Sequence, residues 1–177
     1  IGCTSSKDTA TDTATDAIQS TDSNNTTNRS NKGILSAGLY QTCAISSEKE
    51  LRCWGENVWG ENQPVGSFTS VSAGGVHGCA VEEEGTIRCW GNYDDRGQVS
   101  NTPTTNGFTS VTVGYFHSCA LQENGSVMCW GVDDESDYDY GQVVHTPSDI
   151  GFVQLEAGWH HTCALNDSGQ TTCWGNN

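Results

Sequence analysis

The chain has 177 residues, of which 22 are acidic and 7 are basic, so its formal net charge is −15. This length is typical of one domain, or of one domain with a tail. The charge repels phosphate backbones and anionic headgroups, which disfavours nucleic acid and bare membrane surfaces as partners, whereas basic proteins and cations remain acceptable.

The chain begins with a predicted tether over residues 1–32. Residues 4–31 are almost entirely Thr, Ser, Asp, Asn and Ala, and no aromatic residue precedes Tyr40. Such a segment cannot bury enough apolar surface to offset the entropy of ordering it. We therefore expect a disordered linker here and a folded domain over residues 33–177.

Cys3 lies at the front of this tether, after a small residue, in Ile1-Gly2-Cys3. The triplet resembles the end of a bacterial lipoprotein signal, in which the Cys becomes the lipidated N-terminus. The resemblance implies an anchor at the outer membrane or cell surface, and membrane contact through that anchor alone. The alternative is an ordinary Cys in the tail of a secreted protein.

Four similar blocks follow, about 40 residues apart. Each contains a Cys-Ala-aliphatic run and, ten residues after the first Cys, a Cys-Trp-Gly run. Gly85, Gly125 and Gly169 lie midway between the two runs, where they suit the turn of a β-hairpin. A further strand starts at Phe68, Phe108 and Phe152, with a bulge or a strand end expected because Phe and the next aliphatic residue do not alternate. The pattern predicts an all-β fold of propeller blades.

The cysteine spacing predicts one disulfide in each block. If the turn is centred between the two cysteines, they face each other on adjacent strands at a separation that a disulfide tolerates. The spacing does not fit zinc or a redox-active dithiol, because no Cys-x-x-Cys occurs. Cys3 is left over. The expected pairs are Cys43–Cys53, Cys79–Cys89, Cys119–Cys129 and Cys163–Cys173.

The blocks resemble the repeats of the regulator of chromosome condensation family over about residues 35–177. The second block carries the resemblance in Ala73-Gly74, His77, Gly85, Trp90-Gly91-Asn92 and Gly97-Gln98. The cysteines are similar to those of disulfide-bearing repeats in secreted bacterial proteins and plant receptor ectodomains. The resemblance implies a β-propeller, usually of seven blades. Since four blocks are too few, we expect a partial propeller cut from a longer protein, with a four-bladed ring or closure by two chains as alternatives.

Several residues recur at one position of the repeat, and we expect them to be structural. A hydrogen bond within its own blade is the expected role of each repeated histidine, rather than a ring of metal ligands. Packing between blades is the expected role of the repeated tryptophans. These residues are His77, His117 and His161, and Trp54, Trp90, Trp130 and Trp174.

Candidate partner-binding residues lie outside the repeat pattern. The lengthened loop 133–140 is rich in acidic residues and tyrosine, and two further tryptophans match no repeat position. Loops carry function more often than scaffolds do. The alternatives are a merely solvated loop or calcium binding, although the spacing does not match an EF-hand. The candidates are Trp59, Asp133, Asp134, Asp137, Tyr138, Tyr140 and Trp159.

The sequence shows no Gly-x-Ser-x-Gly, His-Glu-x-x-His or phosphate-binding loop. We therefore expect a non-enzymatic binding module without a cofactor, which contacts a protein or a glycan through variable loops. The sequence leaves two alternatives open. One is a propeller-scaffold enzyme, a lyase or hydrolase with a metal at the axis, and the other is a purely structural envelope protein.

Overall fold

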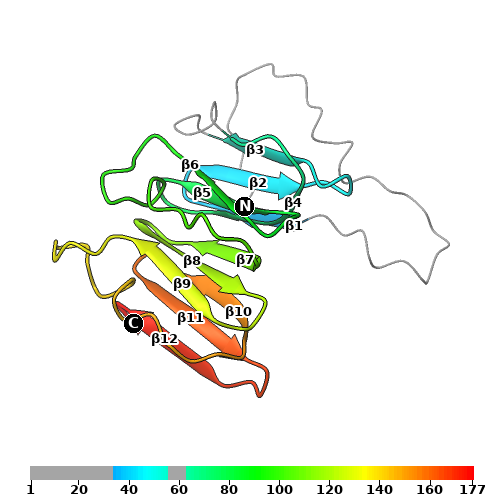
Figure 1. Cartoon of the computed structure of the whole chain (residues 1–177). Helices are drawn as coiled ribbons and strands as arrows, with labels where there is room; N and C mark the ends of the chain where they lie inside the picture. The colour runs from blue at the N-terminus through cyan, green and yellow to red at the C-terminus, as the bar shows by residue number, and fades with distance from the viewer. Residues whose placement is uncertain (1–33, 56–62) are drawn as a thin grey trace, which may run out of the picture. The chain divides into compact units, whose positions relative to one another are not determined.

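The computed structural model describes residues 34–55 and 63–177, so the expected tether over 1–32, Cys3 and Trp59 lie outside the described residues. The described residues form four antiparallel sheets of three strands, which follow one another along the chain (Figure 1). We refer to the sheets as blades 1 to 4. Blade 1 contains β1 (Ile34–Ala37), β2 (Gln41–Ile45) and β3 (Leu51–Gly55); blade 2 contains β4 (Phe68–Ala73), β5 (Gly78–Glu82) and β6 (Ile87–Trp90); blade 3 contains β7 (Phe108–Val113), β8 (His117–Gln122) and β9 (Val127–Gly131); blade 4 contains β10 (Phe152–Ala157), β11 (His161–Asn166) and β12 (Thr171–Gly175).

The second and third strands of every blade form the hairpin that the spacing predicts. In blade 2, Cys79 faces Cys89 across β5 and β6, and Gly85 occupies the turn with φ of 80°. Side-chain-bearing residues rarely adopt this backbone conformation, which explains the Gly. Four disulfides join the facing cysteines, with Cα atoms 4.0–4.1 Å apart, in the pairs 43–53, 79–89, 119–129 and 163–173.

The first strand of blades 2 to 4 contains the expected β-bulge. The register of β4 against β5 shifts between Phe68 and Ser70, and the same shift occurs between Phe108 and Ser110. The extra residue bends the strand and changes the face toward which the following side chains point. As a result Phe68 and Val71, three positions apart, are both buried.

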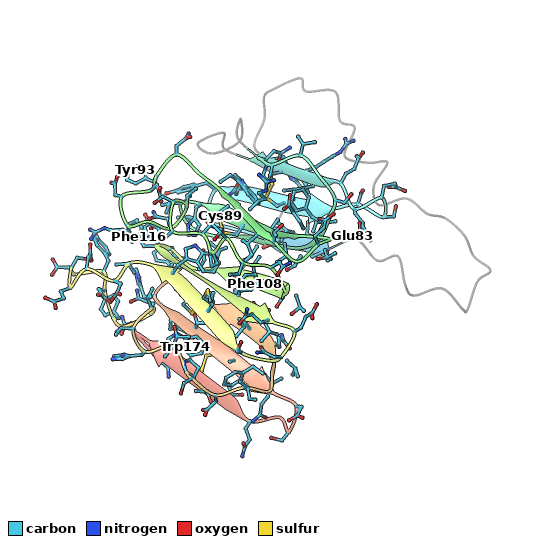
Figure 2. The ribbon with its side chains drawn as sticks, in the orientation of Figure 1. Glu83, Cys89, Tyr93, Phe108, Phe116 and Trp174 are labelled. Carbon is cyan, nitrogen blue, oxygen red and sulfur yellow. A yellow bond between two sulfur atoms is a disulfide. The ribbon has the colours of Figure 1, made fainter. Side chains whose placement is uncertain are left out.

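The hydrophobic core lies between consecutive blades. Each apolar cluster combines the Cys and aliphatic side chains of one blade with the Phe, Val or Leu, Ala and Trp side chains of the next. Between blades 2 and 3, for example, Val81 packs in one cluster with Phe108 and Trp130. Figure 2 shows Phe108 at this layer. A three-stranded sheet therefore buries both faces only when it has a neighbour on each side.

Consecutive blades form backbone hydrogen bonds at the turn between their first and second strands. The Gly75 N–H donates to the Gly114 carbonyl at 3.1 Å, and the Tyr115 N–H donates to the Trp159 carbonyl at 3.0 Å. A Cβ atom on Gly74 would lie 2.4 Å from the Gly114 oxygen. The Gly of the Ala-Gly pair is thus required for backbones to approach across this boundary. The stack of four blades is a partial β-propeller, which confirms the predicted fold class.

We predict that truncation at a layer between blades destabilises the protein far more than truncation on the surface. Val81→Ala removes two methyl groups from a side chain that is fully buried between blades 2 and 3, and it should lower the free energy of unfolding by about 2 kcal/mol. Val153→Ala makes the same change on the exposed side of β10 and should cost less than about 0.5 kcal/mol. Urea unfolding measures both, and equal losses would contradict an inter-blade core.

Candidate functional site

Loop 133–140 is held in shape by one carboxylate. Asp139 accepts the backbone N–H groups of Asp134 and Glu135 on Oδ2, both at 3.0 Å, and that of Gly141 on Oδ1 at 2.9 Å. The hydrogen bond from Gly141, with those from the other two N–H groups, holds the pKa of Asp139 below its ordinary value. The loop is thus built around a charged acceptor rather than left free in solvent.

Gln142 fastens the end of this loop to blade 4. Its side chain is fully buried, with Oε1 accepting the Tyr140 N–H at 2.6 Å and Nε2 donating to the Tyr138 carbonyl at 2.8 Å. Its own carbonyl accepts the indole N–H of Trp174 at 2.9 Å. Gln142 therefore fixes both tyrosines of the loop at the backbone.

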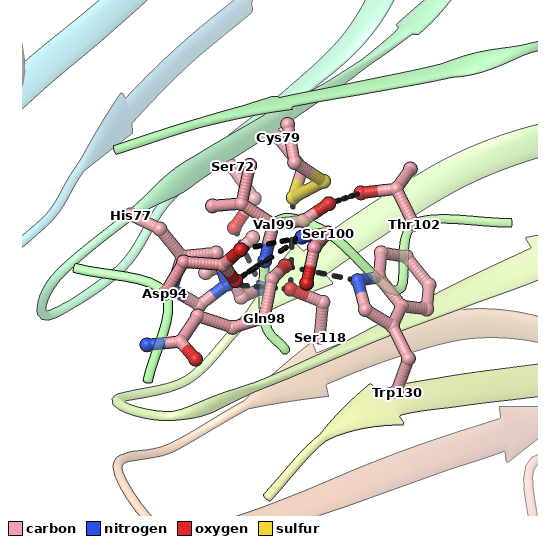
Figure 3. The surroundings of a disulfide bond; sticks show 12 residues. Ser72, His77, Cys79, Asp94, Gln98, Val99, Ser100, Thr102, Ser118 and Trp130 are labelled. Carbon is pink, nitrogen blue, oxygen red and sulfur yellow. Dashed lines mark hydrogen bonds between the residues drawn. A yellow bond between two sulfur atoms is a disulfide. The ribbon is translucent and has the colours of Figure 1, made fainter. Parts of the chain in front are cut away.

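The equivalent Gln98 does the same between blades 2 and 3. Its Oε1 accepts the Arg96 N–H, and its carbonyl accepts the Trp130 indole N–H, both at 3.0 Å. Figure 3 shows Trp130 directed at this carbonyl beside Cys79. The Gly97-Gln98 and Gly141-Gln142 pairs thus connect the loop of one blade to the tryptophan of the next.

Six aromatic side chains meet above the junction of blades 3 and 4. Tyr115 contacts Trp159 at a centroid distance of 5.4 Å, and Phe116 contacts Tyr138 at 5.2 Å. His160 lies within 6.3 Å of Trp159 and of Tyr138. The aromatic cluster, as we call it, comprises Tyr115, Phe116, Tyr138, Tyr140, Trp159 and His160.

Three rings of the aromatic cluster are exposed, and two others are partly buried. Trp159 is 58% exposed, Tyr138 47% and Tyr140 41%, whereas Tyr115 and Phe116 are partly buried beneath them. Burial and the neighbouring His161 lower the pKa of His160, so its ring is neutral near pH 7. Exposed aromatic rings on a fixed base are typical of contact surfaces for other molecules.

A cation already lies beside these rings. The guanidinium carbon of Arg96 is 6.0 Å from the centroids of both Phe116 and Tyr138, and the guanidinium forms an ion pair with Asp134. A hydrogen bond from Ser136, with the Arg96 contact added, lowers the pKa of Asp134. Next to the pair is a cavity of about 370 Å³, whose lining includes Asp95, Asn101 and Asp133. This part of the surface accommodates positive charge.

The structure brings part of the predicted binding set together. Tyr138, Tyr140 and Trp159 belong to the aromatic cluster, while Asp133, Asp134 and Asp137 lie exposed on loop 133–140. Trp59 lies outside the described residues. Sequence reasoning missed Arg96, the dipeptide Tyr115-Phe116, and His160, which forms a dipeptide with the predicted Trp159. The two dipeptides fill the variable pair in Gly-x-x-His, and aromatic residues at that pair in two adjacent repeats were a signal that could have found them.

Two of the three repeated histidines, His77 and His117, connect blades, which corrects the expected bond within one blade. His77 Nε2 shares a hydrogen bond of 2.7 Å with the Ser118 hydroxyl of blade 3, and His117 Nε2 shares one of 2.8 Å with the Thr162 hydroxyl of blade 4. Each hydroxyl also lies 3.6 Å from a disulfide sulfur of the preceding blade. The hydroxyl residue directly precedes the first Cys of its block, so the bond crosses the layer.

Comparison with known protein families identifies the family to which these blades belong. Residues 68–98, 108–142 and 152–177, together more than half of the chain, match the model of the regulator of chromosome condensation (RCC1) repeat. The chain belongs to the RCC1 repeat family. A comparison with curated proteins finds no match.

Solved structures show the same RCC1-type blades. The CRINKLY WD40 ectodomain of the Arabidopsis thaliana receptor kinase ACR4 is 31% identical, with a TM-score of 0.63, over 80% of this chain and 49% of that one. The ectodomain of the Physcomitrella patens receptor kinase CR4 is 28% identical, with a TM-score of 0.67, over 81% of this chain and 40% of that one. Prp20p of Saccharomyces cerevisiae, at 18% identity and a TM-score of 0.63, shares the fold over 80% of this chain and 43% of its own. This chain thus spans less than half the length of these chains.

The RCC1-type blades with four disulfides and the likeness to receptor ectodomains indicate an extracytoplasmic protein. The matching family is defined by its repeat. Within residues 34–55 and 63–177, no helix is long and apolar enough to cross a membrane. The same residues contain no group of three or more His, Cys, Asp or Glu side chains arranged to hold a metal ion.

We predict that acid destabilises the RCC1 blades through two buried imidazoles. Burial lowers the pKa of His77 to about 3 and that of His117 to about 4, from 6.5. Below pH 6.5 the unfolded chain takes up protons at these rings while the folded chain does not. Stability is therefore lost as the pH falls from 6.5 toward 4, by up to about 1.4 kcal/mol per pH unit for each ring.

Urea unfolding at a series of pH values between 6.5 and 4.5 measures this slope. His77→Gln introduces the amide that the first repeat has as Gln41, and it should reduce the slope by about half because one titrating ring is removed. An unchanged slope in this variant would contradict the assignment.

Proposed function

We propose that this chain is a non-enzymatic binding module whose aromatic cluster contacts a protein partner. The observation that supports this most strongly is the combination of three exposed rings, Tyr138, Tyr140 and Trp159, with a loop backbone tied to Asp139 and Gln142. Because the loop is ordered in advance, little conformational entropy remains to be lost on binding. Tyr and Trp are also the residues that contribute most at interface centres.

The partner that fits this surface offers a basic side chain. Arg96 shows that a guanidinium is accepted beside the Phe116 and Tyr138 rings and is paired there by Asp134. Asp133 and Asp137 remain exposed on the same loop, and the whole chain carries a net charge of −15. Electrostatic attraction of this kind speeds association with a basic segment and repels an acidic one.

The proposed location is the cell surface. The resemblance of Ile1-Gly2-Cys3 to the end of a lipoprotein signal supports a lipid anchor at Cys3, with the polar residues that follow acting as a tether. A secreted form that lacks the lipid would present the same surface. In either case the aromatic cluster would meet partners in an extracytoplasmic compartment.

Selection of random linear peptides on the immobilised protein tests the binding surface. Peptides enriched on the wild type should bind Trp159→Ala about 30-fold more weakly, corresponding to about 2 kcal/mol for the loss of a central aromatic side chain. Ile150→Ala truncates an apolar side chain that is 71% exposed and lies outside the cluster, and it should leave the affinity unchanged. No enrichment, or peptides that bind the Trp159 variant equally well, would contradict the proposal.

The preference for basic partners is tested with two variants of equal net charge. Asp133→Asn with Asp137→Asn removes two charges at the loop, whereas Glu84→Gln with Glu123→Gln removes two from the exposed turns of blades 2 and 3. Enriched peptides should contain Arg or Lys and should lose affinity only in the loop variant. Equal losses in both variants would mean that the net charge alone attracts the peptides.

A further inference from the structure

The sequence contains two Asn-Gly dipeptides, and the fold places them in different surroundings. Asn106-Gly107 ends the long connection between β6 and β7, and Asn124-Gly125 lies in the tight turn between β8 and β9 (Figure 1). In such a dipeptide the backbone nitrogen of Gly can attack the side-chain amide of Asn, because Gly carries no side chain that obstructs the approach. The two dipeptides therefore show how the fold controls one reaction at two places.

Asn106-Gly107 leaves the reacting groups free. The Asn106 side chain is exposed, and a Cβ atom on Gly107 would meet no atom of the described residues within 4 Å, its chain neighbours aside. Among residues 34–55 and 63–177, the Gly107 N–H has no acceptor and the Asn106 side chain forms no hydrogen bond. The Gly107 carbonyl accepts the Glu123 N–H at 3.0 Å, so the backbone after the free nitrogen is fixed.

Asn124-Gly125 engages the same groups in hydrogen bonds. The Gly125 N–H donates to the Gln122 carbonyl at 2.9 Å, and Asn124 Oδ1 accepts the Ser126 N–H at 2.9 Å. Gly125 is buried, and a Cβ atom on it would lie 2.5 Å from the Gly151 nitrogen. The attacking nitrogen and the attacked amide can therefore meet only after the turn opens locally.

We propose that Asn106 is a site of spontaneous deamidation, whereas the hairpin turn protects Asn124. The bond between the Gly107 nitrogen and Asn106 Cγ forms, the bond between Cγ and Nδ2 breaks, and the Gly107 proton leaves with Nδ2 as ammonia. Water then adds to either carbonyl of the cyclic imide and opens it to aspartate or isoaspartate. The overall reaction consumes only water, so the chain needs no enzyme for it.

The modification acts next to the layer between blades 2 and 3. Both products add a negative charge before Phe108, and isoaspartate also lengthens the backbone there by a methylene group. Phe108 is buried in this layer, and its N–H donates to the Gly85 carbonyl at 3.0 Å. The reaction does not use the aromatic cluster, and the inference is independent of the proposed function.

Mass spectrometry of the full folded chain, incubated at neutral and at mildly alkaline pH, tests the site. Digestion after Glu123 separates the two dipeptides, and chromatography resolves aspartate from isoaspartate. Deamidation at Asn106 should be at least about tenfold faster than at Asn124, the factor that corresponds to breaking one hydrogen bond before attack. The rate should rise with pH, because the deprotonated nitrogen is the nucleophile. Asn106→Gln should abolish the reaction at this position, since its longer side chain requires a larger ring, and should leave Asn124 unchanged.

The unfolded chain provides the matched control. In guanidinium chloride with the disulfides reduced, neither dipeptide keeps its hydrogen bonds, so both should react at similar rates. A folded chain in which Asn106 reacts no faster than Asn124 would overturn the proposal. So would an Asn106 that reacts far more slowly in the folded chain than in the unfolded one. A difference between the two sites that persists after unfolding would assign it to the neighbouring sequence and would equally overturn the role given to the turn.

Discussion

The disulfide across each hairpin is the constraint on which the rest of the structure depends. A slip of one residue in a β-sheet moves every side chain to the opposite face. By joining Cys79 to Cys89 and its counterparts in the other blades, the covalent bond fixes which side chains face the next blade. The sulfur of Cys79 then lies against the Ser118 hydroxyl that also binds His77.

Given that register, the layers between blades 2 and 3 and between blades 3 and 4 repeat one set of contacts. A histidine bonds to a hydroxyl, a tryptophan to a glutamine carbonyl, and a first-strand N–H to a hydroxyl of the preceding blade, as from Val113 to Ser72 at 3.0 Å. A buried polar group without a partner is costly, so these bonds also restrict which blades can be neighbours. The loops are free of this restriction, and loop 133–140 uses that freedom to build part of the aromatic cluster.

The repeating part of the fold could be predicted from the sequence because its signals are local. The ten-residue cysteine interval, Gly85 in the turn and the spacing of Phe68 and Val71 each describe one blade. The direction of the histidine bonds could not be predicted in this way, because Ser118 lies 41 residues from His77 and the choice between bonding within a blade and bonding across blades depends on packing.

The candidate site likewise contains some residues that could be predicted from the sequence and others that could not. Loop 133–140 and Trp159 stand out because they depart from the repeat, and the structure places both at one junction. Tyr115-Phe116 and Arg96 come from other segments, and only the stacking of blades 2, 3 and 4 brings them to that junction. The exposure of Trp54 was missed for a related reason, because a repeat position predicts burial only where a neighbouring blade is present.

Peptide mapping of the unreduced native protein by mass spectrometry tests the central claim most directly. The account predicts four linked pairs, each joining the two cysteines of one block, Cys43 with Cys53, Cys79 with Cys89, Cys119 with Cys129, and Cys163 with Cys173. Linkages between different blocks, or free thiols at these eight positions, would contradict the register, the layers built on it and the extracytoplasmic location.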